Sequence, residues 1–124
     1  MSTSAAIDPL VSTWANVEPD HPIEKLTRRR VLGERVMIAK VELEPGCEVA
    51  MHRHEMEQVA CVMSGRVLFK LGEPGSEDYR EVEVAGGQVV VLPSQFPHGV
   101  HAIEHTVIFD VLSPPGEMGV DKQK

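Results

Sequence analysis

Regularly spaced turns are the feature that most constrains how this chain folds. From Arg28 onward, strand-like segments are separated by turns about every eight to twelve residues, as at Pro45-Gly46. In residues 40–44, apolar residues alternate with charged ones, which favours strands with one buried face. This pattern is typical of a β-sandwich or barrel, and no stretch has the period of a long helix.

The chain is long enough for one domain, because its 124 residues can bury a single modest core. We expect an N-terminal arm over residues 1–27, a β-barrel over residues 28–116 and a flexible tail over residues 117–124. Trp14 is expected to pack the arm onto the barrel or onto a second subunit.

Two predicted strands, residues 59–63 and 89–92, are apolar at both alternating positions. Both faces of these strands are therefore expected to be covered, although one face of a barrel sheet points outward. The N-terminal arm or a second copy of the chain would cover the outer face, and we expect a homodimer.

The net charge of −7 comes from 12 basic and 19 acidic residues. Nucleic acid is not an expected partner, because proteins that bind it present a basic face. No apolar run is long enough to cross a bilayer, and the N-terminus lacks the pattern of a signal peptide. We therefore expect no membrane partner and a cytoplasmic location. Cys47 and Cys61 form no CxxC motif and are expected to be reduced thiols.

Three histidines and a glutamine have the spacing of metal ligands. His52 and His54 project from the same face of an extended segment, and Gln58 has the same parity. His98 follows a second predicted strand and a turn at residues 93–97. Since imidazole is a common ligand of transition metals, we predict one divalent metal ion (Zn, Ni, Mn or Fe) on these four side chains.

Two glycine-framed motifs surround these ligands. The first runs from Gly46 to Gly65 as Gly-x5-His-x-His-x3-Gln-x6-Gly, and the second runs from Gly87 to His98 as Gly-x5-Pro-x-Gln-x2-His. Together they resemble the two motifs of the cupin superfamily, in its small single-domain form, the cupin 2 type. The resemblance implies an all-β double-stranded β-helix, or jelly-roll barrel, with the metal inside. Gln58 replaces the glutamate that is usual in the first motif.

The glutamine at position 58 changes the expected charge of the site. Neutral histidines and a neutral amide leave a divalent ion near +2, whereas a glutamate would leave it near +1. A more positive ion is a stronger Lewis acid and attracts a small anionic or sugar-like ligand. We therefore expect acid–base or isomerisation chemistry in preference to redox chemistry.

Asp110 interrupts an otherwise apolar predicted strand, residues 107–112. Burial of a carboxylate costs several kcal/mol unless the group is paired or used in chemistry. An Asp110 that faces the barrel interior is a candidate catalytic residue that moves a proton. An Asp110 that faces outward is hydrated or paired with an arginine. His101, His105 and the three arginines at 28–30 are expected at the surface, where the arginines are solvated or guide an acidic substrate.

Within the cupins, residues 29–114 resemble the small bacterial cupins typified by the pectin-degradation protein KdgF. The resemblance implies metal binding through His, His, Gln and His, and proton transfer by an Asp that matches Asp110. That family converts unsaturated uronates toward their linear keto form. Its Phe and its carboxylate-binding Arg correspond here to Leu112 and Gly116, so the same substrate does not follow.

Different classes of function are consistent with these residues. The first is a metal-dependent enzyme of isomerase or lyase type that acts on a small oxygenated acid or sugar (uronate-like). The second is a non-catalytic cupin that binds or senses a small ligand. An iron-dependent dioxygenase is a third alternative. The face on which Asp110 lies discriminates between the first two, and oxygen consumption with iron would favour the third.

Overall fold

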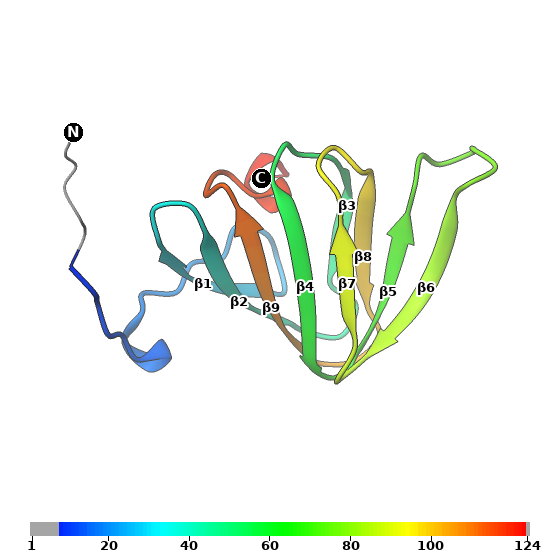
Figure 1. The fold of residues 1–124 in the computed structure, drawn as a ribbon. Helices are drawn as coiled ribbons and strands as arrows, with labels where there is room; N and C mark the ends of the chain where they lie inside the picture. The colour runs from blue at the N-terminus through cyan, green and yellow to red at the C-terminus, as the bar shows by residue number, and fades with distance from the viewer. Residues whose placement is uncertain (1–7, 124) are drawn as a thin grey trace.

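Two antiparallel sheets face each other in this computed structural model, which describes residues 8–123 (Figure 1). The chain forms two short 3-10 helices, η1 (Trp14–Asn16) and η2 (Gly119–Lys122), and the strands β1 (Leu26–Leu32), β2 (Met37–Leu43), β3 (Glu48–His52), β4 (Glu57–Ser64), β5 (Arg66–Leu71), β6 (Arg80–Ala85), β7 (Val89–Leu92), β8 (His98–Ala102) and β9 (Thr106–Ser113). The strand orders are β1-β2-β9-β4-β7 and β3-β8-β5-β6.

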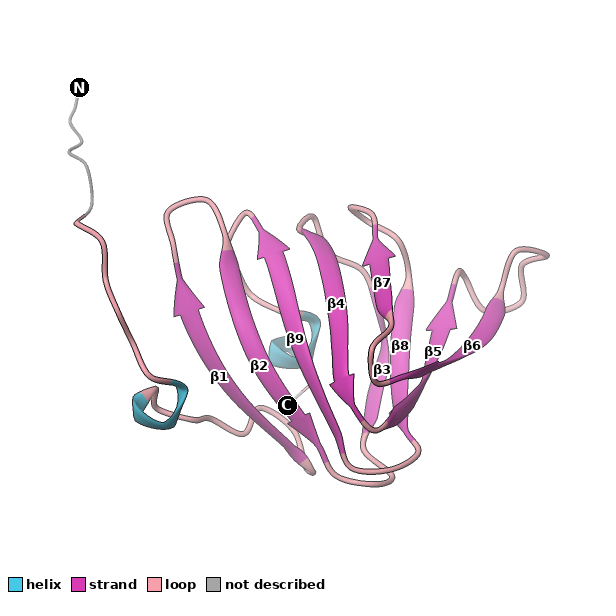
Figure 2. Cartoon of the chain, turned by 60° about the horizontal axis from the view of Figure 1, so that its bottom comes forward, coloured by secondary structure: helices cyan, strands magenta, loops and turns pink. Residues whose placement is uncertain are grey.

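Strands that are far apart in the sequence pair within both sheets. β9 lies between β2 and β4, and β8 lies between β3 and β5. This order wraps the chain into the barrel-like shape seen when the bottom of the molecule is turned forward (Figure 2). The two sheets confirm the predicted all-β jelly-roll fold.

Strand alternation gives the two sheets a shared core. In β2 and in β9, every second residue is buried, and the buried sets are Met37, Ala39, Val41 and Leu43 in β2 and Thr106, Ile108, Asp110 and Leu112 in β9. Burial of their apolar atoms contributes about 25 cal/mol per Å² to folding. Asp110 therefore lies on the inner face of the barrel.

Small side chains surround Asp110 within its sheet. In the strand register it lies opposite Ala39 of β2 and Ala60 of β4. Both alanines are fully buried. Because cross-strand neighbours share one face, this row leaves space in front of the Asp110 carboxyl group.

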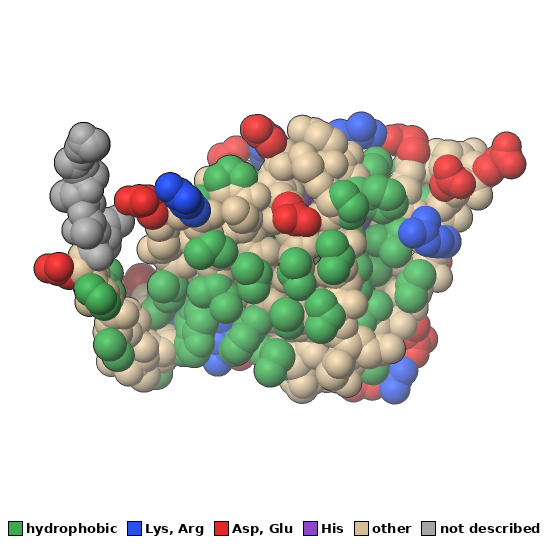
Figure 3. Space-filling view, in the orientation of Figure 1, with side chains coloured by type: hydrophobic (Ala, Val, Ile, Leu, Met, Phe, Trp, Pro, Cys, Tyr) green, Lys and Arg blue, Asp and Glu red, His purple; other side chains and the backbone are tan. Residues whose placement is uncertain are grey.

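Apolar side chains gather on the outer face of the five-stranded sheet (Figure 3). Trp14 packs against Phe109 with 5.7 Å between the ring centroids, so the arm does contact the barrel, as the sequence predicted. Val89 and Val91 nevertheless remain 58% exposed. That a second copy of the chain covers them stays a prediction.

Residues 118–123, here called the C-terminal strap, are packed onto the barrel, whereas the sequence predicted a flexible tail. Met118 and Val120 are buried in the core. The Gln123 side chain accepts a hydrogen bond from the Ala50 backbone N–H at 2.9 Å and donates one to the Ala50 carbonyl at 3.1 Å. These long-range contacts order a segment whose local sequence contains no strand or long helix.

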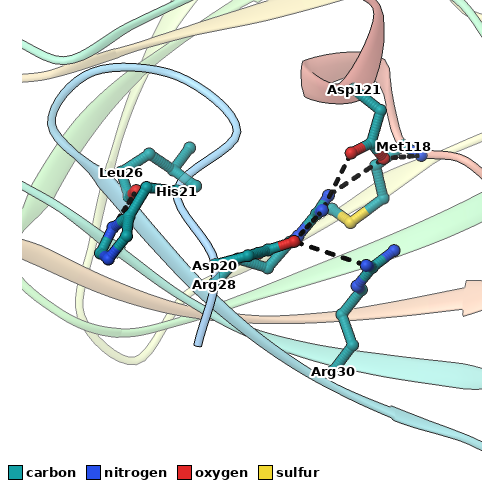
Figure 4. Close-up of polar contacts among 7 residues, drawn as sticks. All are labelled: Asp20, His21, Leu26, Arg28, Arg30, Met118 and Asp121. Carbon is teal, nitrogen blue, oxygen red and sulfur yellow. Dashed lines mark hydrogen bonds and ion pairs between the residues drawn. The ribbon is translucent and has the colours of Figure 1, made fainter. Parts of the chain in front are cut away.

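Arg28 holds the other side of the strap (Figure 4). Its side chain is 1% exposed, so the prediction that it lies on a solvated face is wrong. Its guanidinium donates hydrogen bonds to the carboxylates of Asp20 and Asp121. Since β1 and β3 are edge strands of different sheets, the strap spans the gap between the sheets at this side of the barrel. Neither helix within residues 8–123 is long and apolar enough to cross a membrane.

Gly65→Ala should destabilise the barrel strongly. Gly65 has a φ of +90°, and an added Cβ would lie 2.2 Å from the backbone oxygen of His105. Gly75→Ala is the matched control, because Gly75 has a φ of +89° with no atom within 4 Å of the added Cβ. Urea unfolding should show a loss of about 1–2 kcal/mol for the control and about 4 kcal/mol or more for Gly65→Ala. Equal losses would contradict the crowding at Gly65.

The strap should loosen in acid. Hydrogen bonds from Arg28 lower the pKa of Asp20 below the usual 3.8. In the strap, burial alone would raise the pKa of Asp121, but hydrogen bonds from Arg28 and from the Met118 backbone outweigh it, so this pKa is lowered as well. Carboxylates with a lowered pKa stabilise the fold above pH 4 and lose that contribution as the pH falls below it. The protection of the amides in residues 118–123 against exchange, relative to an unfolded chain at the same pH, should therefore fall below about pH 4 in NMR experiments. Asp121→Asn should show raised exchange already at pH 6, and a strap that stays protected in both cases would contradict this role of Arg28.

Candidate metal centre

Three histidines meet at one end of the barrel. His52 ends β3 and pairs in register with His98, which begins β8. His54 reaches them from the loop before β4, and not from a continuous strand as the spacing predicted. One ring nitrogen from each histidine lies within 4.8 Å of the others. The structure thus brings together side chains that are 46 residues apart in the sequence.

Backbone carbonyls favour the same tautomer in all three rings. The Nδ1 atoms of the three histidines lie 2.8–2.9 Å from the carbonyl oxygens of Ala50, Met56 and Phe96. A neutral ring that donates through Nδ1 keeps a lone pair on Nε2, which is the arrangement of metal-binding histidines. The Nε2 atom of His98 is buried and has no hydrogen-bond partner among the described residues.

Gln58, on β4, completes the predicted ligand set. Its Nε2 donates a hydrogen bond to Asp110 Oδ1 at 2.9 Å, so its Oε1 points toward the histidines. That oxygen lies 3.2 Å from His54 Nε2. In the His54 tautomer that donates through Nδ1 to Met56, His54 Nε2 and Gln58 Oε1 both carry lone pairs, and two acceptors at this distance can share a cation between them. The donor set therefore fits a divalent metal.

Burial shifts the pKa of the groups around this cluster. It lowers the pKa of His52, and it lowers the pKa of His98 to about 4, so both rings are neutral at pH 7. Burial also raises the pKa of Asp110 to about 7, although the hydrogen bond from Gln58 works in the opposite direction. The site combines neutral ligands with a carboxyl group that is costly to ionise.

A cavity of about 50 Å³ lies in front of these residues. Asp110 lines it, which resolves the two alternatives for its orientation in favour of the interior. Arg28, which the sequence predicted on a solvated face or as a guide for an acidic substrate, is the other charged residue of the cavity wall. The strap residues that complete the wall, Met118, Gly119 and Val120, were not predicted from the sequence. The sequence contained one indication that Arg28 is buried. Arg28 lies two residues after Leu26 in β1, so both side chains point to the same face, and Leu26 is buried.

The other candidate residues lie away from the cluster. His105 is exposed, and His101 lies 2.5 Å from a carboxylate oxygen of Glu48. Cys47 and Cys61 are free thiols, and burial raises the pKa of Cys47 to about 11, so this thiol is unreactive. Neither cysteine adds a ligand to the three-histidine cluster.

Comparisons with known proteins agree with this fold. A family model described as a cupin domain matches residues 39–113. The fold is similar to an RmlC-like cupin from Shewanella frigidimarina (TM-score 0.78, 21% identity, 89% of this chain and 95% of that chain). It is also similar to KdgF from a Halomonas species (TM-score 0.72, 21% identity, 82% of this chain and 92% of that chain).

A larger protein contains a similar domain. The oxalate decarboxylase of Lactobacillus farciminis, solved as a formate complex, has a TM-score of 0.76 at 16% identity, over 93% of this chain and 36% of that chain. No curated protein matches the sequence. At these identities the structural likeness concerns the fold alone. Because the cupin model covers more than half of the sequence and the fold agrees with it, the chain belongs to the cupin domain family.

Proposed function

We propose that the protein is a metal-dependent enzyme of isomerase or lyase type that moves a proton on a small oxygenated acid or sugar acid. The observation that carries the proposal is the Gln58 amide, whose oxygen faces the histidine cluster while its nitrogen donates to Asp110. One side chain thereby links the candidate metal ligands to the candidate proton carrier. The resemblance of the ligand set to that of the KdgF group supports the same class of chemistry.

The three histidines and Gln58 would hold one divalent ion. A bound ion supplies Lewis acidity toward an oxygen atom of the ligand. Because their Nδ1 atoms are held by backbone carbonyls, the imidazole rings are already oriented with Nε2 toward the site. All four ligands are neutral, so the positive charge remains available to attract an anionic ligand.

Asp110 would carry the proton. Its carboxyl group can give a proton to a substrate carbon and then take one from a substrate hydroxyl. In a cyclic unsaturated uronate the C=C bond carries the ring oxygen. Protonation of the carbon and loss of the anomeric hydroxyl proton, with cleavage of the ring C–O bond, give the open-chain ketone and aldehyde and return Asp110 to its starting state. The hydrogen bond from Gln58 fixes the carboxyl group, and the alanines beside it in the sheet leave room for a substrate.

Metal binding should depend on His98. We expect about one zinc ion per chain by metal analysis after reconstitution, and an affinity at least about 100-fold lower in His98→Ala. At a free zinc concentration of 100 times the dissociation constant, the metal should stabilise the wild-type fold by about 2.7 kcal/mol. His105→Ala is the control, because His105 is exposed and outside the cluster. A wild-type protein that takes up no metal would contradict the proposal.

Asp110→Asn should remove activity and keep the metal. With the unsaturated uronate released from pectin as substrate, loss of the C=C proton signal in NMR measures conversion to the keto form. We expect a rate about 10²- to 10⁴-fold lower in the variant, because the amide cannot transfer the proton, with zinc affinity within about threefold. Asp78→Asn, in an exposed loop, is the control.

The outcomes of this assay separate the classes of function. Unchanged turnover in Asp110→Asn would exclude Asp110 as the proton carrier. Metal binding without turnover of unsaturated uronates would favour the non-catalytic binding cupin. Oxygen uptake by the iron-loaded protein would favour the dioxygenase.

A further inference from the structure

One wall of the cavity at the metal centre does not belong to the barrel. It is formed by Met118, Gly119 and Val120 of the C-terminal strap. A Cβ added at Gly119 would lie 2.1 Å from the His52 ring, so the strap backbone rests directly on a candidate metal ligand. The His52 ring is thus in van der Waals contact with a glycine that leaves no space between strap and ligand.

With the strap in this position, the cavity is too small for a sugar acid. Its volume of about 50 Å³ holds one or two water molecules. Pockets for small-molecule ligands measure roughly 300–1,000 Å³. A ligand of that class therefore fits only after residues 118–120 have moved away from the metal centre.

An ion pair between Asp121 of the strap and the buried Arg28 holds the strap at the cavity. Asp121 accepts hydrogen bonds from Arg28 Nη1 and Nη2 at 3.0 and 2.9 Å (Figure 4). Asp20 accepts bonds from Nε and Nη2 on the other edge of the guanidinium. The backbones of Asp20 and Arg28 also form an antiparallel β-bridge. Asp20 is therefore expected to stay in place when the strap moves.

We propose that Arg28 is the binding residue for the carboxylate of a small organic acid, and that Asp121 occupies this place while the ligand is absent. A ligand carboxylate would replace Asp121 in the same two-bond geometry, which arginine favours for carboxylates. The strap is then a displaceable internal competitor for the site. The inference takes its ligand class from the proposed function, but it concerns binding alone.

The exchange of one carboxylate for another keeps Arg28 paired throughout. Removal of one partner from a buried ion pair is strongly unfavourable, because it leaves charge without compensation. An acid that displaces Asp121 restores both charge-assisted hydrogen bonds, whereas a neutral sugar of the same size offers only uncharged acceptors without the carboxylate geometry. The site should therefore select acids over their neutral analogues.

Galacturonate and its methyl ester are suitable probes, because they differ only in the carboxylate and contain no C=C bond to be converted. Calorimetric titration of the zinc-loaded wild-type protein should show at least about tenfold tighter binding of the acid. Arg28→Lys, which keeps the charge and loses the two-bond geometry, should reduce this preference to about threefold or less. A preference that persists in a folded Arg28→Lys variant would assign the carboxylate to the metal and overturn the proposal.

A matched pair of variants tests the competition by the strap. Asp121→Asn and Asp20→Asn each remove one carboxylate from the same guanidinium, but only Asp121 belongs to the strap. We expect Asp121→Asn to bind galacturonate about five- to tenfold more tightly than the wild type and Asp20→Asn to show no gain. Equal gains would show a general charge effect and overturn the proposal, as would an Asp121→Asn variant that does not bind galacturonate.

Movement of the strap provides a readout that is independent of affinity. Galacturonate should raise amide exchange in residues 118–123 of the wild-type protein, and at the Ala50 amide that Gln123 caps. Unchanged exchange at saturating galacturonate would contradict displacement. Because these experiments need no turnover, inactivity toward unsaturated uronates would reject the proposed reaction and leave this inference standing.

Discussion

The hydrogen bond between Gln58 and Asp110 joins the two halves of the site, the histidine cluster and the buried carboxyl group. A carboxyl group buried in a barrel core needs a donor, and the Gln58 N–H supplies it. Because the Gln58 Nε2 donates to Asp110, the oxygen of the same amide points toward His54. A ring nitrogen and an oxygen that both carry lone pairs then face each other, and a cation relieves their repulsion. The burial of Asp110 and the orientation of the Gln58 oxygen toward the histidine cluster are therefore linked through one side chain.

This interaction also gives a physical reason for glutamine at position 58. A glutamate there would place a second carboxylate against Asp110 and would have no N–H to donate. One of the two groups would have to bind a proton, because like charges in close contact are not both ionised in a buried site. The neutral amide avoids this conflict and leaves the positive charge of a bound ion uncompensated by its ligands.

Local pattern was sufficient for some of these features and not for others. The spacing of His52, His54 and Gln58 predicted a cluster, although the strand register shifts between Val49 and His52 and His54 lies in a loop. The sequence around Asp110 is apolar at both parities, so alternation alone left its face open, and the pairing of β9 with β2 and β4 decides it. The jelly-roll fold followed from the turn spacing and the two motifs, because both are local signals.

The strap and its arginine depend on contacts that no local pattern reveals. Asp121 and Arg28 are 93 residues apart, and neither neighbourhood contains a motif that points to the other. The prolines at 114 and 115 end β9, as a strand terminator should, but they do not determine whether the following residues pack. Packing of Met118 and Val120 is decided by the open side of the barrel between two edge strands, which exists only in the folded chain.

The position of Asp110 between two alanines depends on the register in which β9 pairs with β2 and β4. If β9 slipped by one residue against β2 and β4, Phe109 or Val111 would take the inner position and Asp110 would point to the outer face. An aromatic or branched side chain would then fill the space in front of Gln58. Because the outer positions of β9 are also apolar, hydrophobicity discriminates weakly against this slip. The hydrogen bond between Asp110 and Gln58 is lost in the slipped pairing, so the polar pair that serves the site also helps to select the correct alignment of the barrel.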